Sequence, residues 1–141
     1  LIGNMQIQHV GLADYDFFSN DPSINVMLET DSKVPVMLVT GCKATDFSLF
    51  EIQFIFETGM LTILDGGMRW SERRVIDSKI FENYKELDLG VDSEGGYLDT
   101  MSNAVDGIWR AITNDETLNS TIDNALTAQT ICEKILAKST S

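Results

Sequence analysis

The stretch 49–67, LFEIQFIFETGMLTILDGG, decides the fold on which the rest of the chain is built. Its first half alternates with a period of two, as in a β-strand, where successive side chains point to opposite faces. One face carries what we call the hairpin stripe, Phe50, Ile52, Phe54 and Phe56, and the other carries Glu51, Gln53, Ile55 and Glu57. Thr58–Gly59 interrupts this run, and a second apolar run over 60–64 ends at Asp65–Gly66–Gly67. The stretch predicts a β-hairpin with the hairpin stripe buried.

Strands are also expected on both sides of this hairpin. Upstream, residues 5–10, 23–30 and 34–42 alternate like strands, with a tight turn at Asp31–Ser32–Lys33, and a ragged strand around 15–18 is an alternative to a loop there. Downstream, 68–76 and 86–89 are expected as strands and 90–96 as a loop. Residues 34–42 are apolar on both faces, so we expect this strand to be covered on both sides. The connections are too short for crossover helices, so neighbouring strands must be mostly antiparallel.

Helical periodicity replaces the strand pattern after residue 96. The first apolar stripe consists of Tyr97, Met101, Ala104, Val105, Ile108 and Ile112. Ser120 is the expected N-cap of a second helix, with Asp123 three residues later. Its stripe consists of Ile122, Ala125, Leu126, Gln129, Cys132 and Leu136, widened by Ile131 and Ile135. The chain is therefore predicted as a single α+β domain over 1–141: an open, mostly antiparallel sheet of six to seven strands with two C-terminal helices packed on one face.

Composition restricts the classes of function. The net charge of −12 over 141 residues argues against nucleic acid and anionic membrane surfaces, whose phosphates would be repelled. No apolar run is long enough to span a membrane. Cys42 and Cys132 stand among apolar neighbours and are interpreted as buried free thiols, which indicates a reducing, cytoplasmic compartment. The first residue, Leu1, is not a methionine, so we expect a chain shortened at its N-terminus.

Few residues suggest chemistry. The phosphate-binding patterns GxGxxG and GxxxxGK[ST] are absent, and one histidine, His9, with two distant cysteines does not make a zinc pattern. The cluster Arg69, Arg73 and Arg74 concentrates positive charge in an acidic chain. It is interpreted as a solvated strand paired with nearby Glu72 and Asp77, with an anion-binding role as the alternative. No catalytic, cofactor-binding or metal-binding residue is predicted in the chain.

The order of these segments resembles the C-terminal domain of the Gfo/Idh/MocA oxidoreductases, the glucose–fructose oxidoreductase and inositol dehydrogenase-like proteins. Residues 23–30 resemble the family strand before a tight turn, and 50–63 is similar to the family hairpin E-I-x-G-x-x-G-x-L-x-I. Residues 103–137 resemble its closing pair of helices, with Ala125, Leu126, Glu133 and Ile135 at matching places. The first glycine of the hairpin pattern is replaced within 53–56. The matched motifs are packing patterns and cover nearly the whole chain.

The resemblance implies an N-terminal Rossmann domain, absent from this sequence, that binds NAD or NADP and carries the catalytic lysine. It also implies a homo-oligomer formed through the open sheet face. The hairpin stripe is expected under the two C-terminal helices, so the open face is the one that carries Glu51, Gln53, Ile55 and Glu57. The chain is then the substrate-side and dimerisation domain of an NAD(P)-dependent oxidoreductase acting on a sugar, polyol or related small molecule, inactive alone. The alternative is a stand-alone α+β module that binds a ligand or a protein on its open sheet face. Arg69, Trp70 and Tyr97 are the candidates for facing a substrate.

Overall fold

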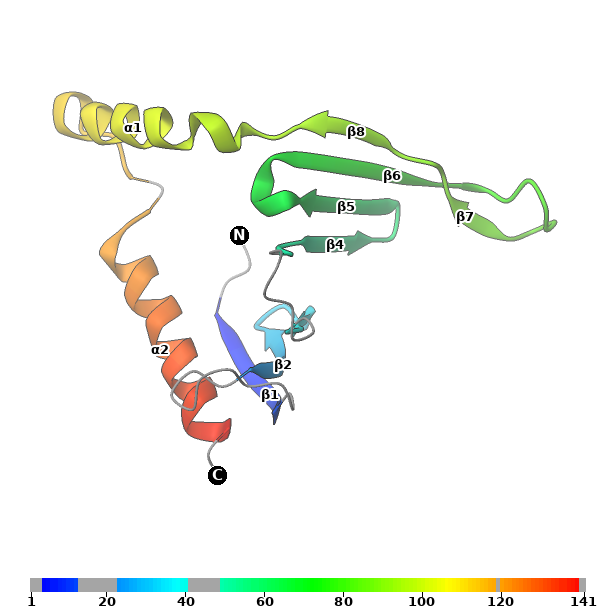
Figure 1. The fold of residues 1–141 in the computed structure, drawn as a ribbon, viewed down its shortest axis with the longest axis horizontal. Helices are drawn as coiled ribbons and strands as arrows, with labels where there is room; N and C mark the ends of the chain where they lie inside the picture. The colour runs from blue at the N-terminus through cyan, green and yellow to red at the C-terminus, as the bar shows by residue number, and fades with distance from the viewer. Residues whose placement is uncertain (1–3, 13–22, 41–48, 119, 140–141) are drawn as a thin grey trace. The chain divides into compact units, whose positions relative to one another are not determined.

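The chain folds as an α+β protein with two antiparallel sheets, one of three and one of five strands, and two α-helices. The computed structural model describes residues 4–12, 23–40, 49–118 and 120–139 (Figure 1). These residues belong to two compact units: Leu1–Asp46 with Asn119–Ser141 form unit 1, and Phe47–Leu118 form unit 2. The predicted class is confirmed, but the strands form two sheets rather than one. The single domain over 1–141 stays a prediction, and the alternatives for 15–18 lie outside the described residues.

Unit 1 contains the three-stranded sheet, in the order β1-β2-β3. Its strands are β1 (Met5–Leu12), β2 (Ile24–Thr30) and β3 (Pro35–Leu38). The register of β1 against β2 shifts between Ile7 and His9, so Ile7 lies opposite Leu28 while Val10 lies opposite Val26. A bulge of one residue explains why the faces of this strand are poorly separated in the sequence: Ile7 and Val10 reach the same side although they are three positions apart.

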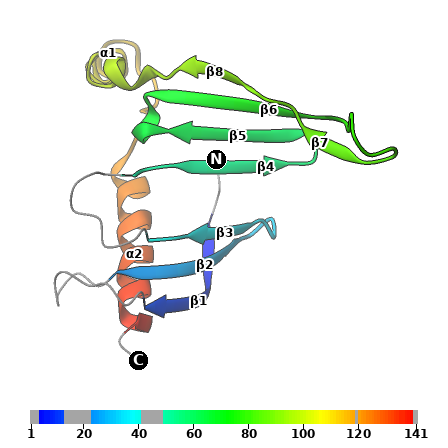
Figure 2. The same ribbon diagram turned by 45° about the vertical axis from the view of Figure 1, so that its right-hand side comes forward.

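The core of unit 1 forms between this sheet and helix α2 (Ile122–Ser139), which runs beside the strands in Figure 2. Val26 and Leu28 of β2 and Ile135 of α2 are the buried hydrophobic side chains of the described residues. Ile131 and Val36 are among the partly buried residues packed against them. The centre of the helix stripe was predicted incorrectly, because Ile131 and Ile135 pack, whereas Leu126 is 57% exposed. Cys132 is an exposed free thiol rather than a buried one, because it follows Ile131 around the helix, away from the packed side. Cys42 lies outside the described residues.

Strand β3 differs from its prediction in length and cover. Of the predicted strand 34–42, the structure describes residues 34–40, and among these the strand is Pro35–Leu38. Its apolar residues on both faces are mostly exposed, with Met37 at 66% and Leu38 at 47%. Strand β3 lies at the edge of its sheet and pairs with β2 alone. The apolar residues on both of its faces did not indicate that it is an edge strand.

The N-cap of α2 is Thr121 rather than the predicted Ser120. Thr121 Oγ1 accepts a hydrogen bond of 3.3 Å from the backbone N–H of Asn124, and the Thr121 carbonyl accepts one of 3.1 Å from Ala125. These are the bonds that an N-cap residue makes to the first turn.

Replacing the cap distinguishes the two positions. We expect Thr121→Ala to reduce stability by about 0.5–2 kcal/mol, because an amide of the first turn loses its acceptor. Ser120→Ala is the matched control and is expected to change stability by less than about 0.5 kcal/mol. Thermal unfolding followed by circular dichroism measures both. Equal losses would assign the cap to neither residue alone.

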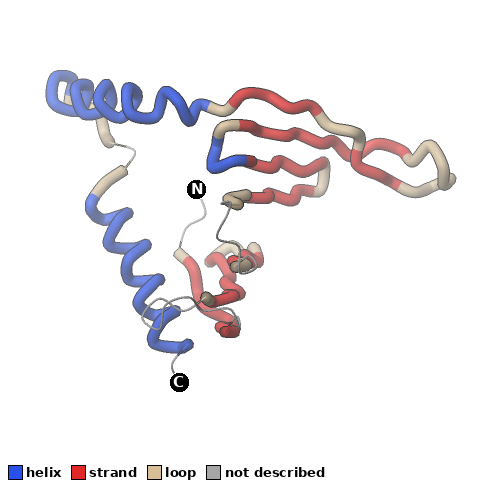
Figure 3. Tube along the Cα trace, viewed as in Figure 1, coloured by secondary structure: helices blue, strands red, loops and turns tan. Residues whose placement is uncertain are grey.

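Unit 2 contains the predicted hairpin and extends it to a five-stranded antiparallel sheet (Figure 3). The strands are β4 (Ile52–Phe56), β5 (Gly59–Leu64), β6 (Arg69–Asp77), β7 (Lys85–Leu87) and β8 (Val91–Glu94). They follow the order β4-β5-β6-β7, with β8 pairing to the other part of β6. The prediction of a loop over 90–96 was wrong, because this segment contains strand β8. The sequence of β8 is mostly polar and does not alternate, so the strand is recognised only by its hydrogen-bonded pairing with β6.

Two short 3-10 helices and one α-helix complete unit 2. Helix η1 (Asp65–Gly67) joins β5 to β6, and η2 (Gly96–Asp99) joins β8 to α1 (Thr100–Asn114). Gly66 and Gly67 have φ of 67° and 104°, left-handed values that glycine adopts without strain. Helix α1 confirms the predicted helical stripe, yet none of its residues, all of which the structure describes, is buried.

Candidate functional site

The three predicted substrate-facing residues gather at one end of the β6–β8 ladder. Arg69 pairs with Glu94 and Trp70 with Ser93, one strand position apart. The backbone N–H of Gly95 donates a hydrogen bond of 2.7 Å to the Met68 carbonyl, which fixes the start of η2 beside the start of β6. Tyr97 follows in η2 and is 47% exposed. Consecutive positions on β6 place Arg69 and Trp70 on opposite faces of the sheet, so the three residues share a region but not one face.

Arg69 is engaged by carboxylates of its own unit. Its Nε lies 2.8 Å from Asp65 Oδ2, and its Nη1 lies 3.6 Å from Asp92 Oδ2. The hydrogen bond and charge of Asp65 raise the pKa of Arg69 above its ordinary value, so the guanidinium stays protonated. All three side chains are more than half exposed, and the pair adds little to stability because solvent screens it. A bound anion would have to compete with two carboxylates already in place.

The other two arginines of the cluster are also paired. Arg73 donates from Nε to the Asp88 carbonyl at 2.8 Å and from Nη2 to the Leu87 carbonyl at 3.3 Å. Arg74 Nε lies 2.8 Å from Glu72 Oε1. The interpretation of this cluster as a paired strand is supported for Glu72, while Asp77 pairs with Lys85 instead. Each of the three arginines therefore has a partner within unit 2.

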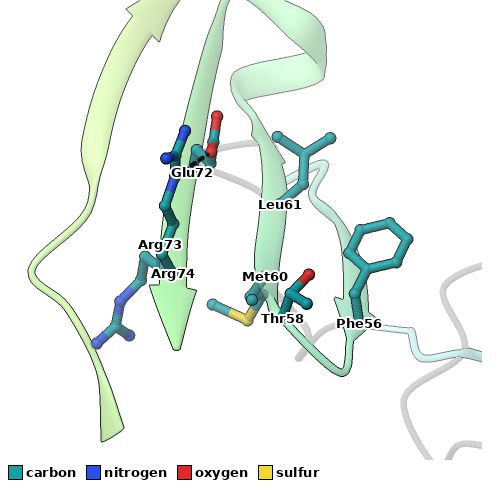
Figure 4. Close-up of a pocket in the computed structure, with 8 residues that line it drawn as sticks. Phe56, Thr58, Met60, Leu61, Glu72, Arg73 and Arg74 are labelled. Atoms are coloured by element: carbon teal, nitrogen blue, oxygen red, sulfur yellow. Dashed lines mark hydrogen bonds and ion pairs between the residues drawn. The ribbon is translucent and has the colours of Figure 1, made fainter. Parts of the chain in front are cut away.

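An open groove of about 440 Å³ lies at the Thr58 end of the hairpin (Figure 4). It is lined by Phe56, Thr58, Gly59, Met60, Leu61, Glu72, Arg73 and Arg74. Since Glu72 pairs with Arg74 and Arg73 binds backbone carbonyls, the surface that remains for a ligand is mainly that of Phe56, Met60 and Leu61. The groove therefore offers apolar contact more than anion recognition.

The largest departure from the sequence prediction is the exposure of one sheet face, which we call the aromatic face. The register aligns Ile52 with Ile63 and Trp70, and Phe54 with Leu61, across three strands. Trp70 is 41% exposed and Phe56 58% exposed. The rings of Phe54 and Phe56 stack with their centroids 6.5 Å apart. The aromatic face comprises Ile52, Phe54, Phe56, Leu61, Ile63 and Trp70.

The sequence predicted that the hairpin stripe lies under both C-terminal helices. For α1, the helix of the same unit, this prediction was wrong. Helix α1 leaves Met101, Val105 and Ile112 more than half exposed, so it does not bury its stripe on the strands of unit 2. The alternation of the hairpin revealed that this face is apolar. It carried no signal for what covers the face, because side-chain period reports direction and not neighbours.

Other chemistry is sparse in the described part of the chain. His9 is exposed on β1, opposite Met27. Residues 4–12, 23–40, 49–118 and 120–139 contain no group of three or more His, Cys, Asp or Glu side chains placed to hold a metal ion. No helix among them is long and apolar enough to cross a membrane.

Fold and surface together define an α+β protein with an antiparallel sheet that presents an exposed apolar face. Comparisons of the chain with protein-family models, with curated proteins and with solved structures found no match.

Proposed function

We propose that the chain is an association domain: the C-terminal substrate-side and dimerisation domain of an NAD(P)-dependent oxidoreductase that acts on a sugar, polyol or related small molecule. The observation that carries the association is the exposed aromatic face. Apolar surface gathered on one face of a sheet, rather than scattered singly, is typical of a contact with another macromolecule. The oxidoreductase parent rests on the resemblance of residues 23–30, 50–63 and 103–137 to that family.

The cofactor-binding part of this proposal predicts that the isolated chain binds neither NADH nor NADPH, since NAD or NADP belongs to the Rossmann domain of the parent. Titration with NADH and with NADPH, followed by nicotinamide fluorescence, is the test. Saturable micromolar binding would overturn the proposal. Restoring the chain to its parent protein and recovering cofactor binding there would support it.

The substrate-side part predicts an effect on KM in the parent enzyme. Trp70→Ala and Tyr97→Ala are expected to raise KM several-fold with a smaller change in kcat, because these exposed rings would contribute binding rather than chemistry. Arg69→Ala is expected to have a smaller effect than either, since Arg69 is already paired with Asp65. Unchanged KM in all three variants would remove Arg69, Trp70 and Tyr97 as substrate-facing residues.

The second candidate function is a stand-alone binding module that uses the same sheet face. The pairing of Arg69, Arg73 and Arg74 within unit 2 favours it, because the remaining open surface is suited to an apolar ligand or a protein. The coding sequence before Leu1 separates the two candidates. An upstream strand, glycine-rich turn and helix would favour the oxidoreductase, and an initiator methionine directly before Leu1 would favour the module.

A further inference from the structure

Unit 2 carries two apolar surfaces that have no cover within it: the aromatic face of the sheet and one side of α1. The side of α1 that concerns us consists of Met101, Val105, Ile108 and Ile112, spaced by four, three and four residues and therefore lying along one helix face. Their exposed fractions are 76%, 63%, 52% and 75%. We call this surface the α1 stripe.

The junction before α1 directs the helix away from its own sheet. Gly95 is bonded to Met68 and lies so close to η1 that a Cβ on it would be 1.9 Å from the Gly67 carbonyl oxygen. Thr100 Oγ1 donates a 2.7 Å hydrogen bond to the Tyr97 carbonyl, which continues η2 directly into α1. In both Figure 1 and Figure 2, α1 extends beyond the end of β8 instead of lying over the strands.

The two surfaces match in character and in length. A helix of 15 residues is about 22 Å long, and strand β5, with six residues, spans about 20 Å. Both surfaces are apolar, and the charged residues of α1, Asp106 and Arg110, lie on the side of the helix opposite Ile108. On the sheet side, Glu72 and Arg74 of β6 share this face, opposite Leu61 and Gly59, and are paired with each other. A helix laid by its α1 stripe over β4 and β5 therefore brings no charge of its own into the contact.

We propose that the chain forms a twofold dimer in which α1 of each copy covers the β4 and β5 part of the aromatic face of the other and leaves Trp70 on β6 open. A second copy is the occupant because each chain offers both halves of the contact, while its own hydrogen-bonded junction keeps them apart. Reciprocal exchange of one element is an established route to closed dimers. This inference rests on the proposed association function and specifies the surfaces that carry it.

Sedimentation velocity of four single variants of the full chain tests the contact from both sides. Ile108→Glu on the α1 stripe and Ile52→Glu on the aromatic face are each expected to raise the dimer dissociation constant at least about tenfold, since each places a charge in an apolar contact. Asn103→Glu, on the polar side of α1, and Ile55→Glu, on the opposite face of β4, are the matched controls, expected to change it less than about twofold. Far-UV circular dichroism is expected to stay unchanged, because all four positions are exposed.

Cross-linking tests whether the contact is made between copies. Differently tagged chains carrying Ile108→Cys or Ile52→Cys, with Cys42 and Cys132 replaced by serine, are mixed and treated with a short bis-maleimide. A cross-link between the two tags is expected. A chain that carries both cysteines is the comparison. A link that forms within this chain and not between the two tags would overturn the proposal, because α1 would then cover its own sheet.

The outcomes also separate this inference from the proposed function. A dimer that Ile55→Glu disrupts and Ile108→Glu does not would overturn the exchange and leave an association domain that uses the opposite face. Binding of NADH or NADPH by the isolated chain would instead overturn the proposed function, whatever the result for α1.

Discussion

Leu28→Ala is expected to destabilise the protein by about 2–5 kcal/mol, among the largest effects of any single substitution in unit 1. Leu28 is 4% exposed and lies between Ile7 of β1 and Val36 of β3 in the register of the sheet. With Val26 and Ile135 it forms the buried core of the unit, so its removal leaves a cavity that few neighbours can close. Urea unfolding followed by far-UV circular dichroism measures the loss.

Met27→Ala is the matched control for this prediction. Met27 is the preceding residue of the same strand, points to the other face, and is 45% exposed. We expect it to cost no more than about 1 kcal/mol, because much of its side chain already contacts water. If the two variants lost equal stability, the core would not lie on the side of β2 that faces α2.

Gly95→Ala is expected to destabilise unit 2 by about 1–3 kcal/mol, the cost of forcing extra volume into close packing. The added Cβ would meet the Gly67 carbonyl oxygen at 1.9 Å and Trp70 Cδ1 at 3.0 Å. The carbonyl is backbone, so relief requires η1 and the start of η2 to separate and the Gly95–Met68 hydrogen bond to lengthen. Because Trp70 lies at this contact, its fluorescence in a Trp109→Phe background reports the change directly.

Gly96→Ala provides the matched comparison one residue later. A Cβ at Gly96 has nothing within 4 Å, and Gly96 is not among the glycines with positive φ. We expect no loss of stability, or a small gain, because alanine reduces the freedom of the unfolded chain. A similar loss in both variants would mean that the junction tolerates no side chain in general and that the contact with η1 is not the cause.

The sequence was sufficient for the elements that depend on local pattern. The alternation over 50–57 and the apolar run over 60–64 predicted the hairpin, which forms as β4 and β5 with Ile52 opposite Ile63. The helical spacing after residue 96 predicted α1 and α2. Period alone determines these elements, because it fixes which side chains share a face whatever lies next to that face. The α+β class follows from their order along the chain.

Other features depended on contacts between distant segments. The bulge between Ile7 and His9, the pairing of the polar strand β8 with β6, and the choice of Ile131 and Ile135 as the packed side of α2 all require a partner element. The N-cap is Thr121 instead of Ser120 because α2 begins at Ile122. Either of two adjacent hydroxyl residues could serve as the cap, so the sequence does not determine the first residue of the helix. None of these leaves a distinct mark in the local pattern.

The candidate site divides in the same way. The sequence by itself predicted that residues 50, 52, 54 and 56 form one apolar face, of which 52, 54 and 56 lie in β4, and it singled out Arg69, Trp70 and Tyr97 as candidates for facing a substrate. Only the tertiary structure decided that Arg69 is held by Asp65, that Trp70 extends the aromatic face, and that α1 leaves this face exposed. The physical reason is that alternation sets the direction of a side chain, whereas burial and pairing are set by whichever segment the fold brings against it.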